Sequence, residues 1–166
     1  MTTRGSNFSC CVLLAACAFS ASQLAAADKL SDVLRKAKWD GVIGTWVDPE
    51  TKGKLRKTTY EWKIKDRVIA ISSQQDSAEH FSLMGVNGKT GQVFHMSASG
   101  DGTSSLGKWE FKDDGDAVLQ LLYTTGDGQE GGLSVRHRLE DADSMTMTLE
   151  LPQPIRWKMI RVKEKK

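Results

Sequence analysis

Apolar and polar residues alternate one by one along most of this 166-residue chain, and this alternation restricts its fold more than any other feature. The aromatic residues Tyr60 and Trp62, for example, flank the charged residue Glu61. Successive side chains of a β-strand point to opposite faces of a sheet, so each alternating segment predicts a strand with one apolar and one polar face. The pattern is clearest in residues 57–64, 132–140 and 144–151.

Turn signals rich in Gly, Asp, Asn and Pro separate the alternating segments. Their spacing is close to the roughly 8 to 12 residues typical of all-β barrels and sandwiches with hairpin connections. We therefore predict about nine or ten strands, over residues 42–48, 55–64, 67–74, 78–86, 92–98, 104–112, 117–124, 132–140, 144–151 and 154–163. Alternation is mixed in 78–86 and 92–98, so the inward face of those two strands is not assigned.

One segment has helical spacing instead. In residues 28–38 the apolar residues Leu30, Val33, Leu34 and Ala37 recur at the intervals of a short amphipathic helix. Successive antiparallel strands joined by short loops must protect their open edges, and closing the sheet on itself removes both edges. We predict an all-β, up-and-down antiparallel barrel of about nine to ten strands, with one short N-terminal helix.

The first 27 residues have the pattern of a secretory signal peptide. They carry one cation, Arg4, and no acid, followed by an apolar run and small residues up to Ala27. We therefore predict a signal peptide over 1–27, a barrel domain over 28–166, and an exported, periplasmic or extracellular protein. The segment ending at Cys17 also resembles a bacterial lipobox, so a lipid anchor on Cys17 is an alternative to cleavage after Ala27.

Composition excludes several classes of function. Loss of Arg4 with the leader leaves Lys and Arg only one ahead of Asp and Glu, so no broad basic field is present and no nucleic-acid partner is expected. All three cysteines lie in the leader, which leaves no disulfide framework and no cysteine metal site. After residue 27 there is no uninterrupted run of about 20 apolar residues, so no transmembrane helix is expected.

The start of the first strand suggests a family. A short helix followed by Gly44-Thr45-Trp46 resembles the Gly-x-Trp opening of lipocalin and calycin barrels. The chain is also similar to a group of small exported bacterial proteins with a lipocalin-like domain, through Tyr60-Glu-Trp62 and the turn that ends at Gly91. This resemblance implies noncovalent binding of a small apolar or amphipathic molecule. The chain departs from the family pattern by having no C-terminal helix.

The resemblance also implies how one barrel end is closed. In lipocalins the opening tryptophan closes that end and a basic residue of the last strand packs over its ring. The matching positions here are Trp46 and Arg161, and Arg161 shares its parity with the apolar residues Trp157 and Met159. An ordinary charge at a strand end is the alternative interpretation of Arg161.

Inward parity gives a set of candidate ligand-contacting residues. Aromatic, thioether and imidazole side chains on the apolar faces of the strands would line a pocket, with Tyr60 and His137 as polar groups. The same residues could equally fill the barrel as plain core, which would favour an envelope interaction or structural protein instead. The candidates are Tyr60, Trp62, Trp109, His137, Met147 and Trp157.

No residue pattern points to catalysis. His80, His95 and His137 lie in three separate segments without the short spacing of metal ligands, so we predict no metal site and no cofactor. No Gly-x-Ser-x-Gly elbow is present, and Gly85 begins a hairpin turn, without the spacing of a phosphate-binding loop. His137 sits on an apolar face, where it is either a hydrogen-bonded core residue or, as the enzyme alternative, an axial ligand of haem.

Overall fold

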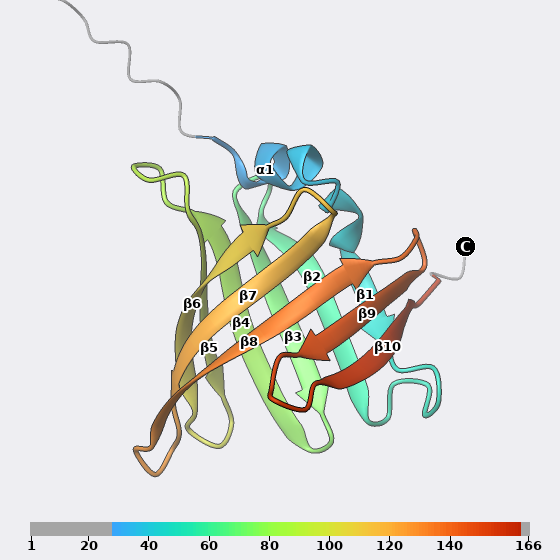
Figure 1. Cartoon of the computed structure of the whole chain (residues 1–166), viewed down its shortest axis with the longest axis vertical. Coiled ribbons are helices and arrows are strands. Elements are labelled where there is room, and N and C mark those ends of the chain that lie inside the picture. Colours follow the sequence, from blue (N-terminus) through green and yellow to red (C-terminus); the bar gives the residue numbers. More distant parts are fainter. Residues whose placement is uncertain (1–27, 164–166) are drawn as a thin grey trace, which may run out of the picture.

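Ten strands close into one antiparallel barrel in a computed structural model that describes residues 28–163 (Figure 1). The signal peptide predicted over residues 1–27, with Cys17, lies outside the described residues. Two short helices precede the barrel, α1 (Leu30–Lys36) and the 3-10 helix η1 (Asp40–Val42). The strands are β1 (Gly44–Val47), β2 (Arg56–Ile64), β3 (Val68–Gln75), β4 (Ala78–Val86), β5 (Val93–Ser99), β6 (Ser104–Phe111), β7 (Asp116–Thr124), β8 (Glu130–Leu139), β9 (Ser144–Leu149) and β10 (Ile155–Arg161).

Every strand pairs with its neighbour in sequence, and β1 pairs with β10 to close the ring. At the closure Trp46 lies opposite Arg161 and Val47 lies opposite Ile160. The predicted all-β, up-and-down barrel with one short N-terminal α-helix is therefore confirmed.

Most strand boundaries lie within one residue of the predicted ones, but β9 ends at Leu149 and β10 at Arg161, two residues before their predicted ends, and two strands begin two residues from their predicted starts. β1 begins at Gly44 and not at residue 42, because Asp40–Val42 form the 3-10 turn that leads into the barrel. β8 begins at Glu130 instead of residue 132, because its first residues pair with the end of β7, where Thr124 lies opposite Glu130. Pairing of β8 with β7 thus begins before the residues whose alternating pattern predicted this strand.

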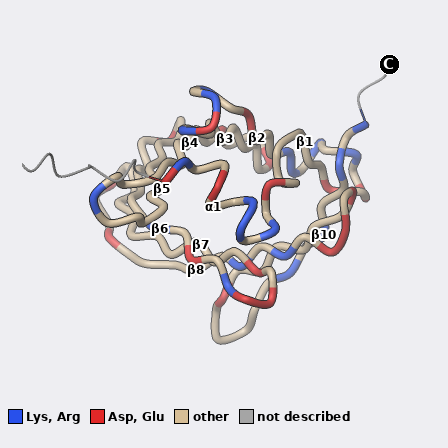
Figure 2. Tube along the Cα trace, turned by 90° about the horizontal axis from the view of Figure 1, so that it is seen from above, with Lys and Arg blue, Asp and Glu red and all other residues tan. Residues whose placement is uncertain are grey.

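α1 and η1 close one end of the barrel, where β1 begins (Figure 1). Viewed from above, α1 lies within the ring of strands (Figure 2). Leu30 and Leu34 of α1, and Trp39 and Val42 in and beside η1, have no exposed surface. The helical stripe seen in the sequence therefore faces into the barrel and supplies part of its core. Between residues 28 and 163 no helix has the length and apolarity needed to cross a bilayer.

The pairing register shows which side chains of β4 and β5 face the barrel interior, which the sequence pattern did not assign. Ile69, which is buried, lies opposite Met84, and Met84 lies opposite His95, so these three side chains share the inward face of β3, β4 and β5. Two residues along the same strands, Ser82 and Ser97 also face inward. The inward faces of β4 and β5 thus carry polar residues, which explains why their alternation is mixed in sequence.

One carboxylate on the outer face of the barrel is buried by its partners. The side chain of Asp116 has no exposed surface, and it accepts hydrogen bonds from Arg136 at 2.9 Å and from Arg138 at 2.6 and 2.9 Å. Hydrogen bonds from Arg138 are the main reason that the pKa of Asp116 is lowered. This ion-pair cluster joins β7 to β8.

Candidate functional site

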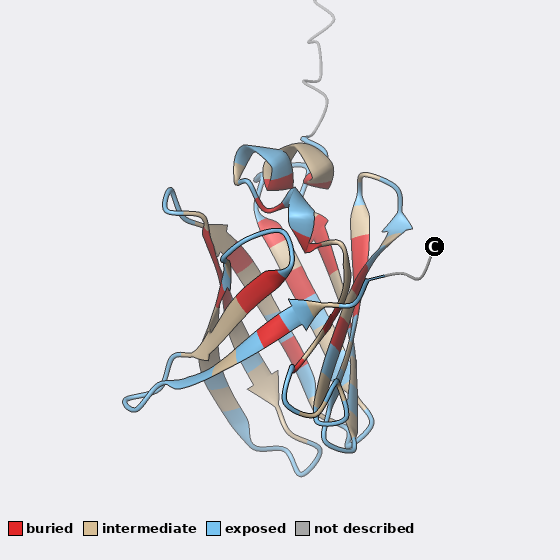
Figure 3. Ribbon diagram, turned by 90° about the vertical axis from the view of Figure 1, so that its right-hand side faces the viewer, coloured by how far each residue is buried: buried red, intermediate tan, exposed pale blue. Residues whose placement is uncertain are grey.

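The barrel interior divides into two halves. We call the half next to α1 the helix half and the half near the hairpins β1–β2, β3–β4, β5–β6, β7–β8 and β9–β10 the distal half. Buried segments gather in the helix half and the middle of the barrel, whereas the distal hairpins are exposed (Figure 3). The two halves therefore differ in how far their residues are buried.

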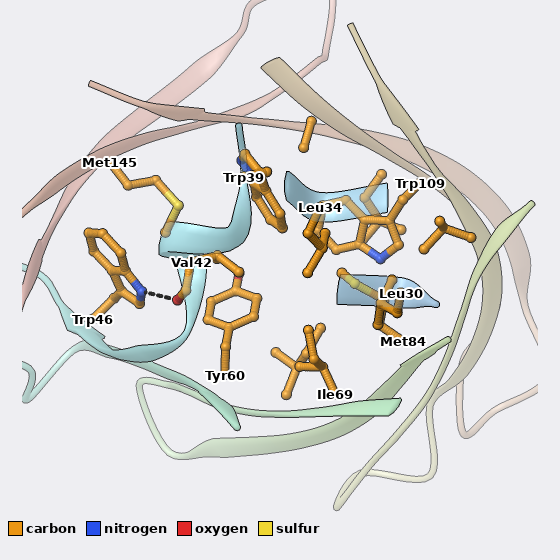
Figure 4. Packing of buried hydrophobic residues seen from close by; sticks show 14 of the residues in the cluster. Leu30, Leu34, Trp39, Val42, Trp46, Tyr60, Ile69, Met84, Trp109 and Met145 are labelled. Atoms are coloured by element: carbon orange, nitrogen blue, oxygen red, sulfur yellow. Dashed lines mark hydrogen bonds between the residues drawn. The ribbon is translucent and has the colours of Figure 1, made fainter. Parts of the chain in front are cut away.

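Trp39 is the centre of the packing in the helix half (Figure 4). Its ring centroid lies 5.3 Å from that of Trp109, 5.6 Å from that of Phe111 and 6.2 Å from that of Tyr60. Burial raises the pKa of Tyr60, so this phenol stays neutral. Trp39, just before η1, and aromatic side chains of β2 and β6 thus fill the barrel below α1, with no exposed surface on Trp39 itself.

Arg161 packs over Trp46, as the resemblance implies. The guanidinium carbon lies 4.3 Å from the centroid of the Trp46 ring. Arg161 also donates hydrogen bonds to the carbonyl groups of Gly41, Ile43 and Ala142, the last two at 2.6 and 2.7 Å. A side chain at Gly44 would approach Arg161 Nη1 to 2.6 Å, so the glycine of the Gly-Thr-Trp motif makes room for the guanidinium.

Two buried histidines flank Trp109. The Trp109 centroid lies 4.9 Å from that of His137 and 6.1 Å from that of His95. Desolvation lowers the pKa of each imidazole to about 4, so both rings are neutral at physiological pH. Nδ1 of each histidine and Nε1 of both Trp39 and Trp109 have no hydrogen-bond partner among the described residues. These polar groups lie in the middle of the barrel at a cost in free energy.

The surroundings of His137 do not fit a haem. Only 3% of the residue is exposed, and Trp109 and Trp39 pack against its ring with centroids at 4.9 and 6.1 Å. A porphyrin coordinated by His137 would have to take the place of these two indoles. Within residues 28–163 no group of three or more His, Cys, Asp or Glu residues is arranged to hold a metal ion.

The distal half has an apolar side that solvent reaches. Its inward-facing apolar residues, which come from β7 to β10, are only partly buried although the sheet is closed around them. Solvent therefore contacts inward-facing apolar side chains at the distal end of the barrel, where no helix covers the strands. The residues of this apolar side are Leu121, Leu133, Val135, Met147, Leu149 and Trp157.

Opposite them, β2 to β6 give the distal half a hydroxyl side. Ser97 and Ser105 lie in hydrogen-bond contact at 2.6 Å, and Ser73 donates a hydrogen bond to Thr58 at 3.2 Å. The inward-facing hydroxyl residues are Thr58, Ser73, Ser82, Ser97, Ser99 and Ser105. The distal interior therefore has one polar and one apolar side, which suits a molecule that is itself amphipathic.

The six candidate ligand-contacting residues all face inward, but they do not form one surface. Tyr60, Trp109 and His137 are buried in the middle and helix half, with at most 4% exposure. Met147 and Trp157 are paired neighbours on β9 and β10 in the distal half. The sixth, Trp62, lies at the α1 end of β2, beside Ile43 and Arg161 at a surface groove of about 540 Å³.

Arg56 is the residue of the distal half that sequence reasoning missed. It pairs with Gln75 at the start of β2 and shares the inward parity of Thr58 and Tyr60, so the alternation already placed it inside. Its guanidinium carbon lies 5.3 Å from the centroid of the Trp157 ring. Its Nε is buried and has no hydrogen-bond partner among the described residues.

Comparison with known proteins adds no family assignment. No protein-family model matches the chain, and a search of curated proteins found no match. The lipocalin-like resemblance therefore depends on the sequence motifs, and the barrel and the Trp46–Arg161 contact are consistent with it.

Proposed function

We propose that the protein binds a small amphipathic molecule noncovalently in the distal half of its barrel. The observation that carries this proposal is the partial exposure of inward-facing apolar side chains in a closed barrel whose other end is filled by α1 and Trp39. Apolar surface that a protein leaves accessible to water inside a concave site is typical of ligand pockets.

Burial of apolar surface would supply most of the affinity. Each 100 Å² of apolar surface that ligand and barrel remove from water contributes about 2 to 3 kcal/mol. The hydroxyl side would accept and donate hydrogen bonds to the polar groups of the ligand and so fix its orientation. No covalent step is involved, and we assign no catalytic residue.

A fluorescence titration with N-phenyl-1-naphthylamine, a neutral amphipathic dye, tests the proposal. Val135 faces the distal interior, whereas Leu122 on the adjacent strand β7 faces solvent with 73% exposure. We expect the dye to bind the unmodified protein with enhanced emission, and Val135→Trp to weaken binding more than tenfold by occupying the site. Leu122→Trp serves as the matched control and leaves the affinity within about twofold. Absence of dye binding, or equal loss in both variants, would contradict the proposal.

A second candidate function, that of an interaction protein, is favoured by the outer face. Met96, Leu106 and Leu122 lie opposite one another on β5, β6 and β7 and are 44%, 64% and 73% exposed. They border a surface groove of about 700 Å³. Contiguous exposed apolar side chains of this kind mark interaction surfaces. A Leu106→Ser and Leu122→Ser double variant that loses an envelope partner but retains dye binding would assign this face a role of its own.

We also propose that the protein is exported. The charge and apolar pattern of residues 1–27 supports this, and no described residue bears on it. Intact-mass measurement on protein from its own host separates the two cleavage alternatives. A mature chain that begins at Asp28 indicates cleavage after Ala27, an N-terminal Cys17 with added acyl mass indicates a lipid anchor, and an uncleaved chain contradicts export through either signal.

A further inference from the structure

Arg56 is the one charged side chain of a strand that faces the distal interior. The inward faces of β2 to β10 in that half otherwise carry hydroxyl, amide, imidazole, aromatic, thioether or aliphatic groups. Asp and Glu residues within β1 to β10 face outward, as Glu61 and Glu79 do beside the inward-facing Tyr60 and His80. The strands of the distal half thus place one cation and no carboxylate on its inner face, and the nearest buried carboxylate is that of Asp48, which directly follows β1 and pairs with the backbone of Arg56.

The guanidinium of Arg56 has no acidic partner among the described residues. No carboxylate lies within salt-bridge distance of it, although its own backbone N–H donates to Asp48 Oδ2 at 3.0 Å. The carboxylate of Asp48 instead accepts hydrogen bonds from that backbone N–H and from Thr51. The backbone N–H and the hydroxyl of Thr51 each donate to it at 2.7 Å. Asp48 therefore fixes the backbone at Arg56 without neutralising its side chain.

Trp157 holds the guanidinium in place. With the guanidinium carbon 5.3 Å from the ring centroid, the indole stabilises the cation but offers no hydrogen-bond acceptor. Nε of Arg56 remains buried and unpartnered. A buried donor on a cation without an acceptor is costly, and an oxyanion that accepts from it forms a strong, charge-assisted hydrogen bond.

We propose that Arg56 binds the oxyanion head group of an anionic amphiphile, whose apolar part lies against Trp157, Met147 and Leu149. The apolar side of the distal half begins at Trp157, so head group and chain have adjacent places to bind. This inference rests on the proposed function, because it names the ligand class of the same distal site. The head group is a carboxylate or another oxyanion, and the apolar chain distinguishes the ligand from a free anion.

A matched set of ten-carbon probes tests the charge requirement on the unmodified protein. Decanoate, decanol and decyltrimethylammonium share their alkyl chain and differ in head-group charge, and acetate supplies the carboxylate without the chain. Using displacement of N-phenyl-1-naphthylamine, we expect decanoate to bind at least tenfold more tightly than decanol, and decyltrimethylammonium more weakly than either. Acetate at millimolar concentration displaces no dye. Equal affinities of decanoate and decanol would overturn the inference.

Substitution of Arg56 then assigns the preference to one residue. A charge-assisted hydrogen bond corresponds to about a tenfold to hundredfold change in affinity, so Arg56→Gln weakens decanoate binding by that factor. The same variant leaves decanol binding within about threefold. Lys57→Gln removes the neighbouring cation, which is exposed on the outer face, and leaves both affinities unchanged. Equal loss of decanoate affinity in Lys57→Gln would show general electrostatic attraction and contradict a site at Arg56.

The outcomes separate this inference from the proposed function. If decanol and decanoate both fail to bind the unmodified protein, the distal ligand site itself is wrong. If decanol binds and decanoate binds no more tightly, only the assignment of Arg56 is wrong. The probe series on the unmodified protein decides between these results even if Arg56→Gln does not fold.

Discussion

The helix half and the distal half of the barrel use the same ten strands but fill the interior in opposite ways. In the helix half α1, η1 and inward-facing aromatic residues leave Trp39, Trp46 and Met145 with no exposed surface. In the distal half Met147, two residues after Met145 on the same inward face, is partly exposed, as is Trp157 opposite it. The strands alone therefore do not determine whether the barrel is filled.

The difference comes from what is added to the strands at one end. α1 and the residue before η1 insert Leu30, Leu34 and Trp39 into the ring, and Trp39 alone contacts four other rings. No helix of the described chain covers the distal half. We infer that the helix half provides most of the stability of the fold, which leaves the distal half available for the proposed binding site.

The largest expected effect is that of removing Trp39. Truncation of a fully buried tryptophan leaves a large cavity and costs about 3 to 5 kcal/mol, so Trp39→Ala should lower the free energy of unfolding by that amount. Trp157→Ala, the matched change in the distal half, should cost about half as much, because Trp157 is already partly solvated. Urea denaturation measures both, and equal losses would remove the distinction between the halves.

Substitution of Arg161 should have the next largest effect. Arg161→Met removes the cation from the Trp46 ring and leaves the carbonyl groups of Gly41, Ile43 and Ala142 without this donor. We expect a loss of roughly 2 to 4 kcal/mol. Arg161→Lys keeps the charge but not the planar fork of donors, so it should recover less than half of the loss. Full recovery in the lysine variant would show that charge alone closes the barrel end.

Acid should destabilise the middle of the barrel through His95 and His137. Burial lowers the folded-state pKa of each to about 4, below the unfolded value of roughly 6.5, so the folded state favours the neutral rings. Their contribution to stability is complete above pH 6.5 and is lost as the pH falls toward 4. Between pH 7 and pH 5 we expect a loss of roughly 1 to 2 kcal/mol for each histidine.

The matched variants are His95→Leu and His137→Leu. In urea denaturation at the two pH values, each should lose less stability on acidification than the unmodified protein does. An unchanged pH dependence in the His95 and His137 variants would show that other groups control the acid response.

The fold was predictable because alternation is strong where the barrel interior is apolar. The segments over β2, β8 and β9 alternate cleanly, and the structure places Tyr60, His137 and Met145 inward as their parity requires. In β4 and β5 polar residues such as Ser82 and Ser97 share the inward face with Met84 and Val93, so no continuous apolar face marks these strands. The mixed alternation of these two segments therefore reflects the hydroxyl residues that line one side of the distal half.

The candidate site was predictable in part, because parity specifies the face of a strand but not the depth along the barrel. Trp109 and Trp157 share the inward face, yet Trp109 is buried beneath Trp39 and Trp157 lies in the distal half. The depth depends on how far α1 and η1 extend into the ring, which is a tertiary property. Arg56 followed the same parity and was missed because a charged residue at the start of a strand is usually solvated.

The smallest change is expected for Met147→Ala, and Met145 of the same strand supplies the comparison. Met145 and Met147 face inward on β9, opposite Met159 and Trp157 respectively, and differ mainly in burial. Met147→Ala should cost about 1 kcal/mol or less, whereas Met145→Ala should cost about 2 to 5 kcal/mol because it leaves a closed cavity. Met147→Ala should also weaken binding of N-phenyl-1-naphthylamine, while Met145→Ala leaves that affinity unchanged wherever the protein remains folded. If the dye affinity instead followed stability across the two variants, the helix half would be part of the binding site and its separation from the distal half would be wrong.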